Sequence, residues 1–552
     1  MLQQTALMLV AGLIFLFFFT PDHAEPRLAS LILNIPLLAI FTFVPGLLSY
    51  FFGRRAIRQL TNDRDRQIRQ LQNSKRYTLF FGVIVLAGFV FEVYYLQLPV
   101  LVDKVFAFLK LKNSRALIGM LPLIIAILIT RLAVFELDRQ VRNTSWTRRE
   151  FLVLNLKLML FPLSPFVIYL FIGDLVDHSP LSVRVFFIAN SYLYWIIMFS
   201  IVAVMYVHAP FFMRGIWATR PLPESELRGR INALAKRENI KYRDALVWNT
   251  AGGKIANAGV AGLLPFARYI FMTDSLLSNF TVDEIETVAA HEFGHIKYKH
   301  ILSYLVFSIG YLVFYVLLYV RFLPIIEKLN LGTTYIALFS ATATLLAFYA
   351  YFVLVFRFLS RKFERQADLY AVESTGKPEV FKSALTKLAA VNYTPRRSPR
   401  FFELFRTHPS VARRLEFIDR LIIDDASVLR YRRPIFPVGR MSVLVVIVLS
   451  MLFVANKEAL FPPGDMYYEI GRQYAIEGMI DEAITEFRSA VRVDPKNEHA
   501  HYVLGILYAR KGNREAAIKE LEKTLEINPR NTGAREALKK IQMVENEPQI
   551  TL

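Results

Sequence analysis

The stretch that decides the fold and its chemistry is Thr281-Val-Asp-Glu-Ile-Glu-Thr-Val-Ala-Ala-His-Glu-Phe-Gly-His295. Its first residue is followed three positions later by Glu284, a capping box in which a hydroxyl and a carboxylate bind the first free amides of a helix. Apolar residues then recur at helical spacing. His291 and His295 therefore share one face of the predicted helix, where both imidazoles can reach one Zn²⁺. Glu292 projects beside them, placed to take a proton from water.

A catalytic zinc ion needs a third protein ligand, and Phe363-Glu-Arg-Gln-Ala-Asp368 offers two carboxylates one helical turn apart. Two apolar runs of membrane-crossing length separate His295 from Glu364, so an even number of crossings returns Glu364 to the face that holds the histidines. We predict one zinc ion per chain, bound by His291, His295 and Glu364. Asp368 is predicted to orient a ligating imidazole. The alternative for the two carboxylates is a solvated charged helix face.

The rest of the chain has the composition of a multi-pass membrane protein. Its 552 residues are 54% hydrophobic, with a mean hydropathy of +0.36, too apolar for an ordinary soluble assembly. Apolar runs that can cross a bilayer, which takes about 20 helical residues, recur at 5–20, 28–52, 77–101, 116–135, 151–172, 183–206, 301–320 and 333–356. A shorter ninth run lies at 441–455. We therefore expect a mostly α-helical fold with about eight or nine transmembrane helices.

The net charge of +20 belongs to the membrane region. Residues 457–552 hold 14 Lys/Arg and 16 Asp/Glu, which leaves 52 basic and 30 acidic residues before them. Eight Lys/Arg lie in 54–76 and five in 131–150, and such loops mark the cytoplasmic side. The loop 103–115, with four basic residues, falls on the outer side in this scheme. The distribution favours a lipid bilayer and no nucleic-acid partner, and it places both zinc motifs in the cytoplasm.

The C-terminal tail repeats with a period of 34 residues. The recurring positions are Tyr467, Gly471, Tyr474, Ala483 and Pro495, which return as His501, Gly505, Tyr508, Ala517 and Pro529. This pattern resembles the tetratricopeptide repeat. It predicts an α-solenoid over 464–545, closed by a polar helix near 533–544, that can bind a protein partner.

The zinc motifs, taken with the membrane hairpin between them, resemble a known family. This family is the integral-membrane zinc metallopeptidases that include the type I CAAX prenyl endopeptidase and the bacterial heat-shock membrane protease. The resemblance covers roughly residues 28–421. It implies a polytopic helical membrane metallopeptidase with a small β element beside the zinc helix. It also implies a bacterial inner-membrane location, with the zinc site on the cytoplasmic side.

Two further motifs match this family. Asn257-Ala-Gly-Val-Ala-Gly-Leu263 resembles its segment upstream of the zinc helix, which implies that Asn257 helps to position substrate near an edge strand. Thr407-His-Pro-Ser-Val-Ala-Arg-Arg-Leu415 resembles its downstream motif, which implies that His408 and Arg414 stabilise an oxyanion. The additional N-terminal span and the repeat tail depart from the prenyl-protease pattern, so prenylated substrates do not follow from the resemblance.

These observations divide the chain into six parts. We expect N-terminal transmembrane helices at 1–208, a cytoplasmic catalytic segment at 209–300, a transmembrane hairpin at 301–360, a segment with the third ligand and the Thr-His-Pro motif at 361–440, a last short span at 441–456 and the repeats at 464–545. Whether the last span crosses decides which side of the membrane the repeats face.

The sequence favours a zinc-dependent membrane endopeptidase acting on protein or peptide substrates, with Glu292 as general acid and base. A quality-control protease of the same clan and a repeat-based scaffold with a vestigial zinc site are the alternatives. A transporter is suggested by the spans and by Glu92 and Lys157 inside apolar runs. The membrane runs, however, lack the internal repeat and the paired broken helices typical of transporters.

Overall fold

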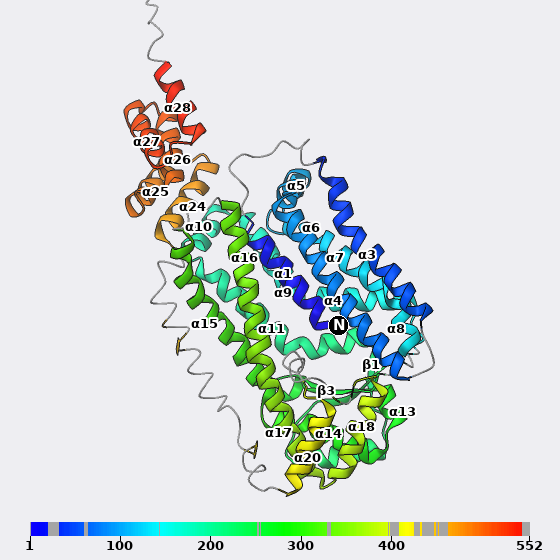
Figure 1. Ribbon diagram of the computed structural model, residues 1–552. Helices are drawn as coiled ribbons and strands as arrows, with labels where there is room; N and C mark the ends of the chain where they lie inside the picture. The colour runs from blue at the N-terminus through cyan, green and yellow to red at the C-terminus, as the bar shows by residue number, and fades with distance from the viewer. Residues whose placement is uncertain are drawn as a thin grey trace, which may run out of the picture. The chain divides into compact units, whose positions relative to one another are not determined.

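A computed structural model describes residues 2–19, 32–59, 64–142, 144–250, 253, 255–327, 333–395, 397, 408–423, 431–432, 447–448, 451 and 462–543. The chain divides into two compact units, one of residues 1–168 and 201–449 and one of 169–200 and 450–552. Helices dominate both units, which confirms the predicted fold class (Figure 1). The predicted ninth span at 441–455 lies almost entirely outside the described residues, as does Thr407.

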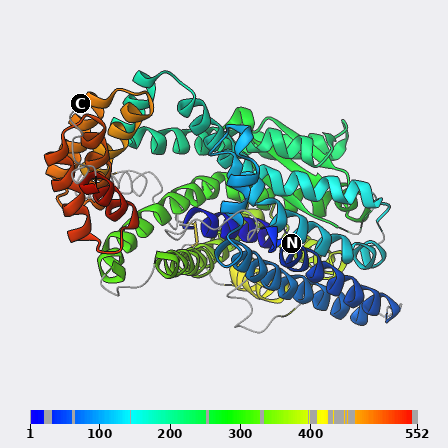
Figure 2. The same cartoon turned by 90° about the horizontal axis from the view of Figure 1, so that it is seen from above.

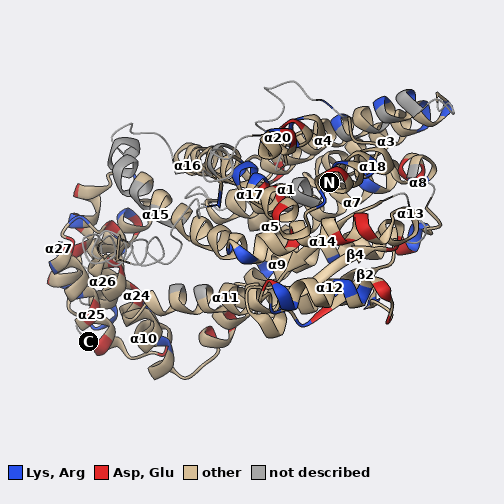
Figure 3. Cartoon of the chain, turned by 90° about the horizontal axis from the view of Figure 1, so that it is seen from below, with Lys and Arg blue, Asp and Glu red and all other residues tan. Residues whose placement is uncertain are grey.

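Six helices of the described residues are long and apolar enough to cross a membrane: Ile35–Arg58, Gln72–Tyr94, Arg115–Ala133, Arg148–Asp177, Tyr192–Ile216 and Thr334–Thr375. Two shorter apolar helices, Leu7–Phe17 and His300–Tyr311, accompany them. Each of the eight longer apolar runs in the sequence therefore coincides with an apolar helix. Figure 3 shows that α11 (Tyr192–Ile216) and α16 (Thr333–Ala350) carry few charged side chains along their lengths.

The remaining N-terminal helices are α1 (Leu2–Phe17), α3 (Ile35–Arg58), α4 (Arg64–Tyr94), α5 (Leu98–Val105), α6 (Arg115–Gly119), α7 (Leu121–Ala133), α8 (Phe135–Arg142), α9 (Arg148–Asp177) and α10 (Leu181–Ala189). Two predicted spans have different bounds in the structure. Helix α4 ends at Tyr94, because Gln97 adopts a left-handed conformation and a new helix begins beside Pro99. The run at 183–206 is interrupted at Asn190, whose side chain binds the carbonyl of Phe186, so α11 begins only at Tyr192.

Of the two ionisable residues inside apolar runs, only Glu92 is buried. Its side chain is 2% exposed, and the hydroxyl of Thr42 on α3 donates to it over 3.3 Å. This contact joins α3 and α4 inside the bundle, as expected for a charged group that avoids lipid. Lys157 on α9 is exposed.

A small mixed sheet precedes the zinc-motif helix. Its strands are β1 (Thr219–Pro221), β2 (Asp244–Trp248), β3 (Ala258–Ala261) and β4 (Tyr269–Thr273), in the order β1-β2-β4-β3. Strands β2 and β4 are parallel, and the other pairs are antiparallel. Strand β3 lies at an edge of the sheet, which confirms the predicted β element beside the zinc helix.

The helices around this sheet are α12 (Glu226–Arg237), α13 (Asp274–Asn279), α14 (Val282–Lys297), α15 (His300–Glu327), α17 (Arg357–Thr375), α18 (Pro378–Val391) and α20 (Val411–Ile423). Helix α14 carries the zinc motif and begins with the predicted capping box. The amide of Glu284 donates to the Thr281 hydroxyl over 3.3 Å, and the amide of Thr281 donates to the Glu284 carboxylate over 3.0 Å. Ile285, Val288 and Phe293 then bury the apolar face of α14 in the core.

Helices α14 and α17 cross at Gly294. A Cβ atom at this position would lie 2.8 Å from Cα of Ala367 and 3.1 Å from Cβ of Tyr370. Only glycine permits this approach, because the nearest atom belongs to the backbone of α17. Helix α17 continues the membrane helix α16 through one π-helical turn at Tyr351–Phe356, so the third-ligand motif lies on the same helical rod as a membrane segment.

The C-terminal unit contains the predicted repeats. Its helices are α24 (Pro463–Ile476), α25 (Ile480–Val493), α26 (Glu498–Arg510), α27 (Arg514–Ile527) and α28 (Thr532–Met543), and each packs against the next along the chain. They are the orange and red helices of Figure 2. At Gly471 a Cβ atom would lie 3.2 Å from the ring of Phe487, and at Gly505 2.8 Å from Leu521. The glycines therefore let paired helices approach closely, as the repeat pattern predicts. Within this unit Arg184 of α10 also binds Gln473 and Glu477 of α24.

The close crossing of α14 and α17 predicts that Gly294→Ala destabilises the protein. The added methyl group would press on the backbone of Ala367, and overpacking of this kind costs about 1–3 kcal/mol. Thermal unfolding in detergent should show a lower midpoint. The control is Gly229→Ala within α12, where a Cβ atom meets nothing within 4 Å. This change should raise the midpoint slightly, since alanine favours helix by roughly 0.5–1 kcal/mol. Equal midpoints for the two variants would contradict the crossing.

Candidate metal centre

Three side chains from two helices converge on one point. His291 and His295 come from α14 and Glu364 from α17, and one donor atom of each lies within 4.8 Å of the others. The four-residue spacing puts both imidazoles on one face of α14. The crossing at Gly294 then brings α17 close enough for Glu364 to reach them. The structure thus brings together the three residues that the sequence predicts as ligands.

The spacing of the donor atoms fits a zinc ion. Nε2 of His291 lies 3.5 Å from one oxygen of Glu364, and Nε2 of His295 lies 3.6 Å from the other. Two ligands bound tetrahedrally at about 2.0–2.2 Å from one ion are separated by roughly 3.3–3.6 Å. The donor set of two imidazoles and one buried carboxylate suits a bound divalent cation.

Asp368 holds the first imidazole from behind. One of its oxygens lies 3.0 Å from Nδ1 of His291, which leaves Nε2 of that ring facing Glu364. Asp368 is fully buried, and Arg414 compensates its charge by donating from Nε and Nη2 over 3.0 and 2.5 Å. This geometry suits the orienting role predicted for Asp368. Two of the three guanidinium nitrogens of Arg414 are thereby bound to Asp368.

A different series of hydrogen-bond contacts begins at Nδ1 of His295, the second imidazole. Nδ1 of His295 lies 2.9 Å from Nδ1 of His300, the first residue of α15. Nε2 of His300 lies 3.0 Å from Oε1 of Gln366 on α17, and Nε2 of Gln366 donates to the carbonyl of Tyr431 over 3.0 Å. No carboxylate takes part in these contacts.

Glu292 lies between the histidines and the edge of the sheet. Its Oε2 accepts a hydrogen bond from the amide of Val260 on β3 over 3.0 Å. The register of β3 and β4 shows why this amide is available, since Thr273 binds the carbonyl of Asn257 and alternate residues of β3 then point away from β4. Glu292 and the free edge of β3 therefore share one side of the centre.

The two other predicted residues lie at the border of the centre. Nδ1 of His408 is 2.9 Å from Oε2 of Glu364, so this histidine reaches the cluster. Asn257 immediately precedes β3, and its exposed side chain makes no contact that ties it to the ligands. Its backbone amide instead donates to the Thr273 hydroxyl over 2.9 Å, which anchors the start of β3.

The electrostatic environment differs between the two imidazoles. Burial lowers the pKa of His291, but its hydrogen bonds to Asp368 and Glu364 outweigh this effect and raise the pKa to about 9. Burial lowers the pKa of His295 well below its usual value. A divalent cation at the centre would favour the neutral form of both rings. Burial, with the nearby charge of Glu364, raises the pKa of Glu292, which makes its carboxylate a stronger base.

His300 and Gln366 are not among the site residues that the sequence predicts. On an unbroken helix, His300 would point about 140° away from His295, because five residues turn a helix by about 500°. The helix in fact ends at Lys297, with Tyr298 as its C-cap, and Lys299 adopts a left-handed conformation with φ 56°. This break in the helix turns the chain so that the ring of His300 contacts the ring of His295. The third histidine of the His291–His300 stretch was the only signal in the sequence.

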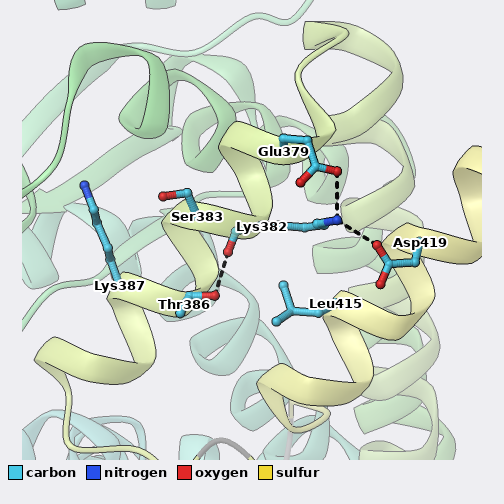
Figure 4. Close-up of a pocket in the computed structure, with 7 residues that line it drawn as sticks. All are labelled: Glu379, Lys382, Ser383, Thr386, Lys387, Leu415 and Asp419. Carbon is cyan, nitrogen blue, oxygen red and sulfur yellow. Dashed lines mark hydrogen bonds and ion pairs between the residues drawn. The ribbon is translucent and has the colours of Figure 1, made fainter.

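A separate hollow lies on the surface between α18 and α20 (Figure 4). At its centre Lys382 joins Glu379 and Asp419 over 2.8 and 2.7 Å. None of the predicted site residues lines this hollow, and Lys382 is shared between its two carboxylates. Among the described residues, the group of side chains that could hold a metal ion lies instead at the crossing of α14 and α17.

Comparison with known proteins identifies the region that carries the centre. Residues 221–422 match Peptidase family M48, and residues 464–512 and 499–531 match tetratricopeptide repeat families. A "Protease HtpX homolog" of Aeropyrum pernix is 26% identical over 270 residues, which cover 40% of this chain and 83% of the relative. A "CAAX prenyl protease 1 homolog" of Dictyostelium discoideum is 27% identical over 243 residues, which cover 41% of this chain and 55% of the relative.

A solved structure is also similar to this chain. The crystal structure of S. mikatae Ste24p is 18% identical, with a TM-score of 0.48, and the match covers 69% of this chain and 98% of that chain. The family match at 221–422 contains all eight site residues that the sequence predicts. Residues 221–422 therefore carry a domain similar to peptidase family M48, tetratricopeptide repeats follow it, and six of the described helices are long and apolar enough to cross a membrane.

Proposed function

We propose that this protein is a zinc-dependent endopeptidase that hydrolyses peptide bonds of protein or peptide substrates at or within the membrane. One observation carries the proposal. Nε2 of His291, Nε2 of His295 and the carboxylate of Glu364 meet at zinc-like spacing, with Glu292 next to them on α14. The family match supports a metallopeptidase, and the apolar helices support a membrane location.

His291, His295 and Glu364 would hold the ion, and Glu292 would move the proton. A bound Zn²⁺ supplies Lewis acidity, polarising the scissile carbonyl and activating water for attack. Glu292 accepts the proton of the attacking water and later delivers it to the departing amine. Its raised pKa supports this role, because a stronger base takes the proton more readily.

The edge of β3 offers a place for the substrate backbone. A peptide that pairs with this edge as an added strand would lie extended beside Glu292. The amide of Val260 points outward from this edge and now donates to Glu292, so a paired substrate would compete for it. We assign Asn257, at the start of β3, to substrate positioning.

His408 and Arg414 contribute positive charge next to Glu364. His408 lies against Glu364, whose negative charge raises the pKa of the imidazole and favours a proton that can stabilise an oxyanion. Arg414 is held by Asp368, so we assign it first to positioning Asp368 and His291. Its Nη1 still lies 4.0 Å from Glu364, close enough to add to the local field.

A quality-control protease of the same clan is the second candidate. The observation that favours it is the pair of repeats, a protein-binding module that could recruit misfolded proteins. A scaffold with a vestigial zinc site is less well supported, because the three ligands and Glu292 are all present and in place. We further propose a bacterial inner-membrane location with the zinc site on the cytoplasmic side, from the basic loops at 54–76 and 131–150.

Glu292→Gln should separate metal binding from catalysis. The amide cannot accept the proton, so we expect a loss of about 10²–10⁴-fold or more in the cleavage of a quenched fluorescent peptide library. Bound zinc should stay near one equivalent, because Glu292 is not a ligand. The control is Asp283→Asn, a half-exposed residue on the same helix, which should keep wild-type cleavage. Cleavage at the wild-type rate by the Glu292→Gln variant would exclude the proposed mechanism. If cleavage is lost as expected, the same variant can trap natural substrates.

Arg414→Ala should destabilise the protein far more than a surface change of the same kind. Asp368 would remain buried without its cation, and an uncompensated buried charge costs about 3–5 kcal/mol. The control is Arg397→Ala, since Arg397 is 83% exposed and its pair with Glu416 is worth no more than about 1 kcal/mol. Thermal unfolding in detergent measures both. A midpoint for the Arg414→Ala variant as high as that of the Arg397→Ala variant would show that Asp368 does not depend on Arg414.

A further inference from the structure

We propose that His300 is a positioning residue for the zinc ligand His295, acting through a neutral hydrogen-bond relay that ends on a backbone carbonyl. The relay runs from His295 through His300 and Gln366 to the carbonyl of Tyr431. It fixes which nitrogen of His295 carries the proton. This inference rests on the proposed function, since it assumes that His295 binds the ion.

The direction of the relay follows from its last member. A backbone carbonyl can only accept, so the Gln366 nitrogen must donate to Tyr431, and the Gln366 oxygen then faces His300. This oxygen can only accept, so Nε2 of His300 carries a proton. In a neutral ring Nδ1 of His300 is then an acceptor. Nδ1 of His295 must therefore donate to it, which leaves the lone pair of its Nε2 directed at the ion.

The surroundings hold this relay rigidly. His300 is 1% exposed, and its ring stacks on Phe363 at 4.2 Å with an angle of 14°. Gln366 is also 1% exposed. The ring of Tyr431, the residue that supplies the terminal carbonyl, packs edge-on against Phe417 at 5.1 Å.

The backbone conformation of Lys299 also supports a positioning role for His300. Lys299 has φ 56°, a left-handed conformation that is unfavourable for a residue with a side chain. Strain of this kind persists where the surrounding structure requires it. Here it turns the chain so that α15 begins with His300 against His295.

Three substitutions at His300 test the relay. Asparagine places an oxygen where Nδ1 stood and so keeps the acceptor for His295, whereas glutamine reaches the position of Nε2 and keeps only the contact to Gln366. Phenylalanine keeps the stacking and neither hydrogen bond. Loss of an outer hydrogen bond to a ligating histidine typically lowers metal affinity about 10–100-fold. We expect such a loss for His300→Phe and His300→Gln, and a smaller loss for His300→Asn.

The measurement is zinc affinity of the full-length protein in detergent, by competition with a chromophoric chelator, with Co²⁺ absorption as a second readout of ligand geometry. The control is His501→Phe in the repeats, because His501 is also a buried histidine bound at both nitrogens. It should leave zinc affinity unchanged. Thermal unfolding of the metal-free variants shows whether asparagine and glutamine destabilise the fold equally.

Nitrogen-15 histidine spectra of the zinc-loaded wild-type protein test the same point without any substitution. His300 should appear as the Nε2–H tautomer and His295 as the Nδ1–H form. The opposite tautomer at His300, or equal zinc affinities for the asparagine and glutamine variants, would overturn the relay. A wild-type protein that binds no zinc would instead overturn the proposed function, whereas zinc binding that is unaffected by His300→Phe would overturn the relay alone.

Discussion

The crossing of α14 and α17 at Gly294 is the contact on which the rest of the catalytic region depends. Gly294 lies inside the zinc motif and has no side chain. A Cβ atom at this position would lie only 2.8 Å from Cα of Ala367, so the glycine is what permits the close approach. The ligands lie on either side of this point, with His291 and His295 on one helix and Glu364 on the other. A wider crossing would leave two histidines and a carboxylate that cannot reach the same ion.

This crossing also joins the centre to the apolar helices. Helix α17 is the continuation of α16, and the combined helix is long and apolar enough to cross a membrane, so Glu364 lies on the same helical rod as a candidate membrane span. Helix α15 begins directly behind the zinc helix and carries His300 at its first position. Two apolar helices, one of them a candidate membrane span, therefore supply contacts to the centre.

The sequence contained the three candidate ligands but not the residues that hold them in place. Four-residue spacing, a capping box and an even number of apolar runs were sufficient to predict that the two histidines meet Glu364 and Asp368, because these are local or topological signals. The repeats were predictable for the same reason, since Gly471 and Gly505 recur with the period of the fold. Arg414 was predicted from a family motif, but its hydrogen bonds to Asp368 depend on how α20 packs against α17. His300 required the left-handed turn at Lys299, and no periodicity reveals such a turn.

A charged carboxylate contacts His291 from behind, whereas a neutral chain of hydrogen bonds contacts His295. The charge of the centre explains this difference. Asp368 behind His291 is compensated by Arg414, while Glu364 and Glu292 bring two further carboxylates. A carboxylate behind His295 as well would add a further negative charge close to Glu292, and its repulsion would raise the pKa of Glu292 further. At a high enough pKa, Glu292 would be protonated before it could act as a base. A neutral relay through His300 and Gln366 orients His295 without adding charge, so it holds the ligand and leaves the base available.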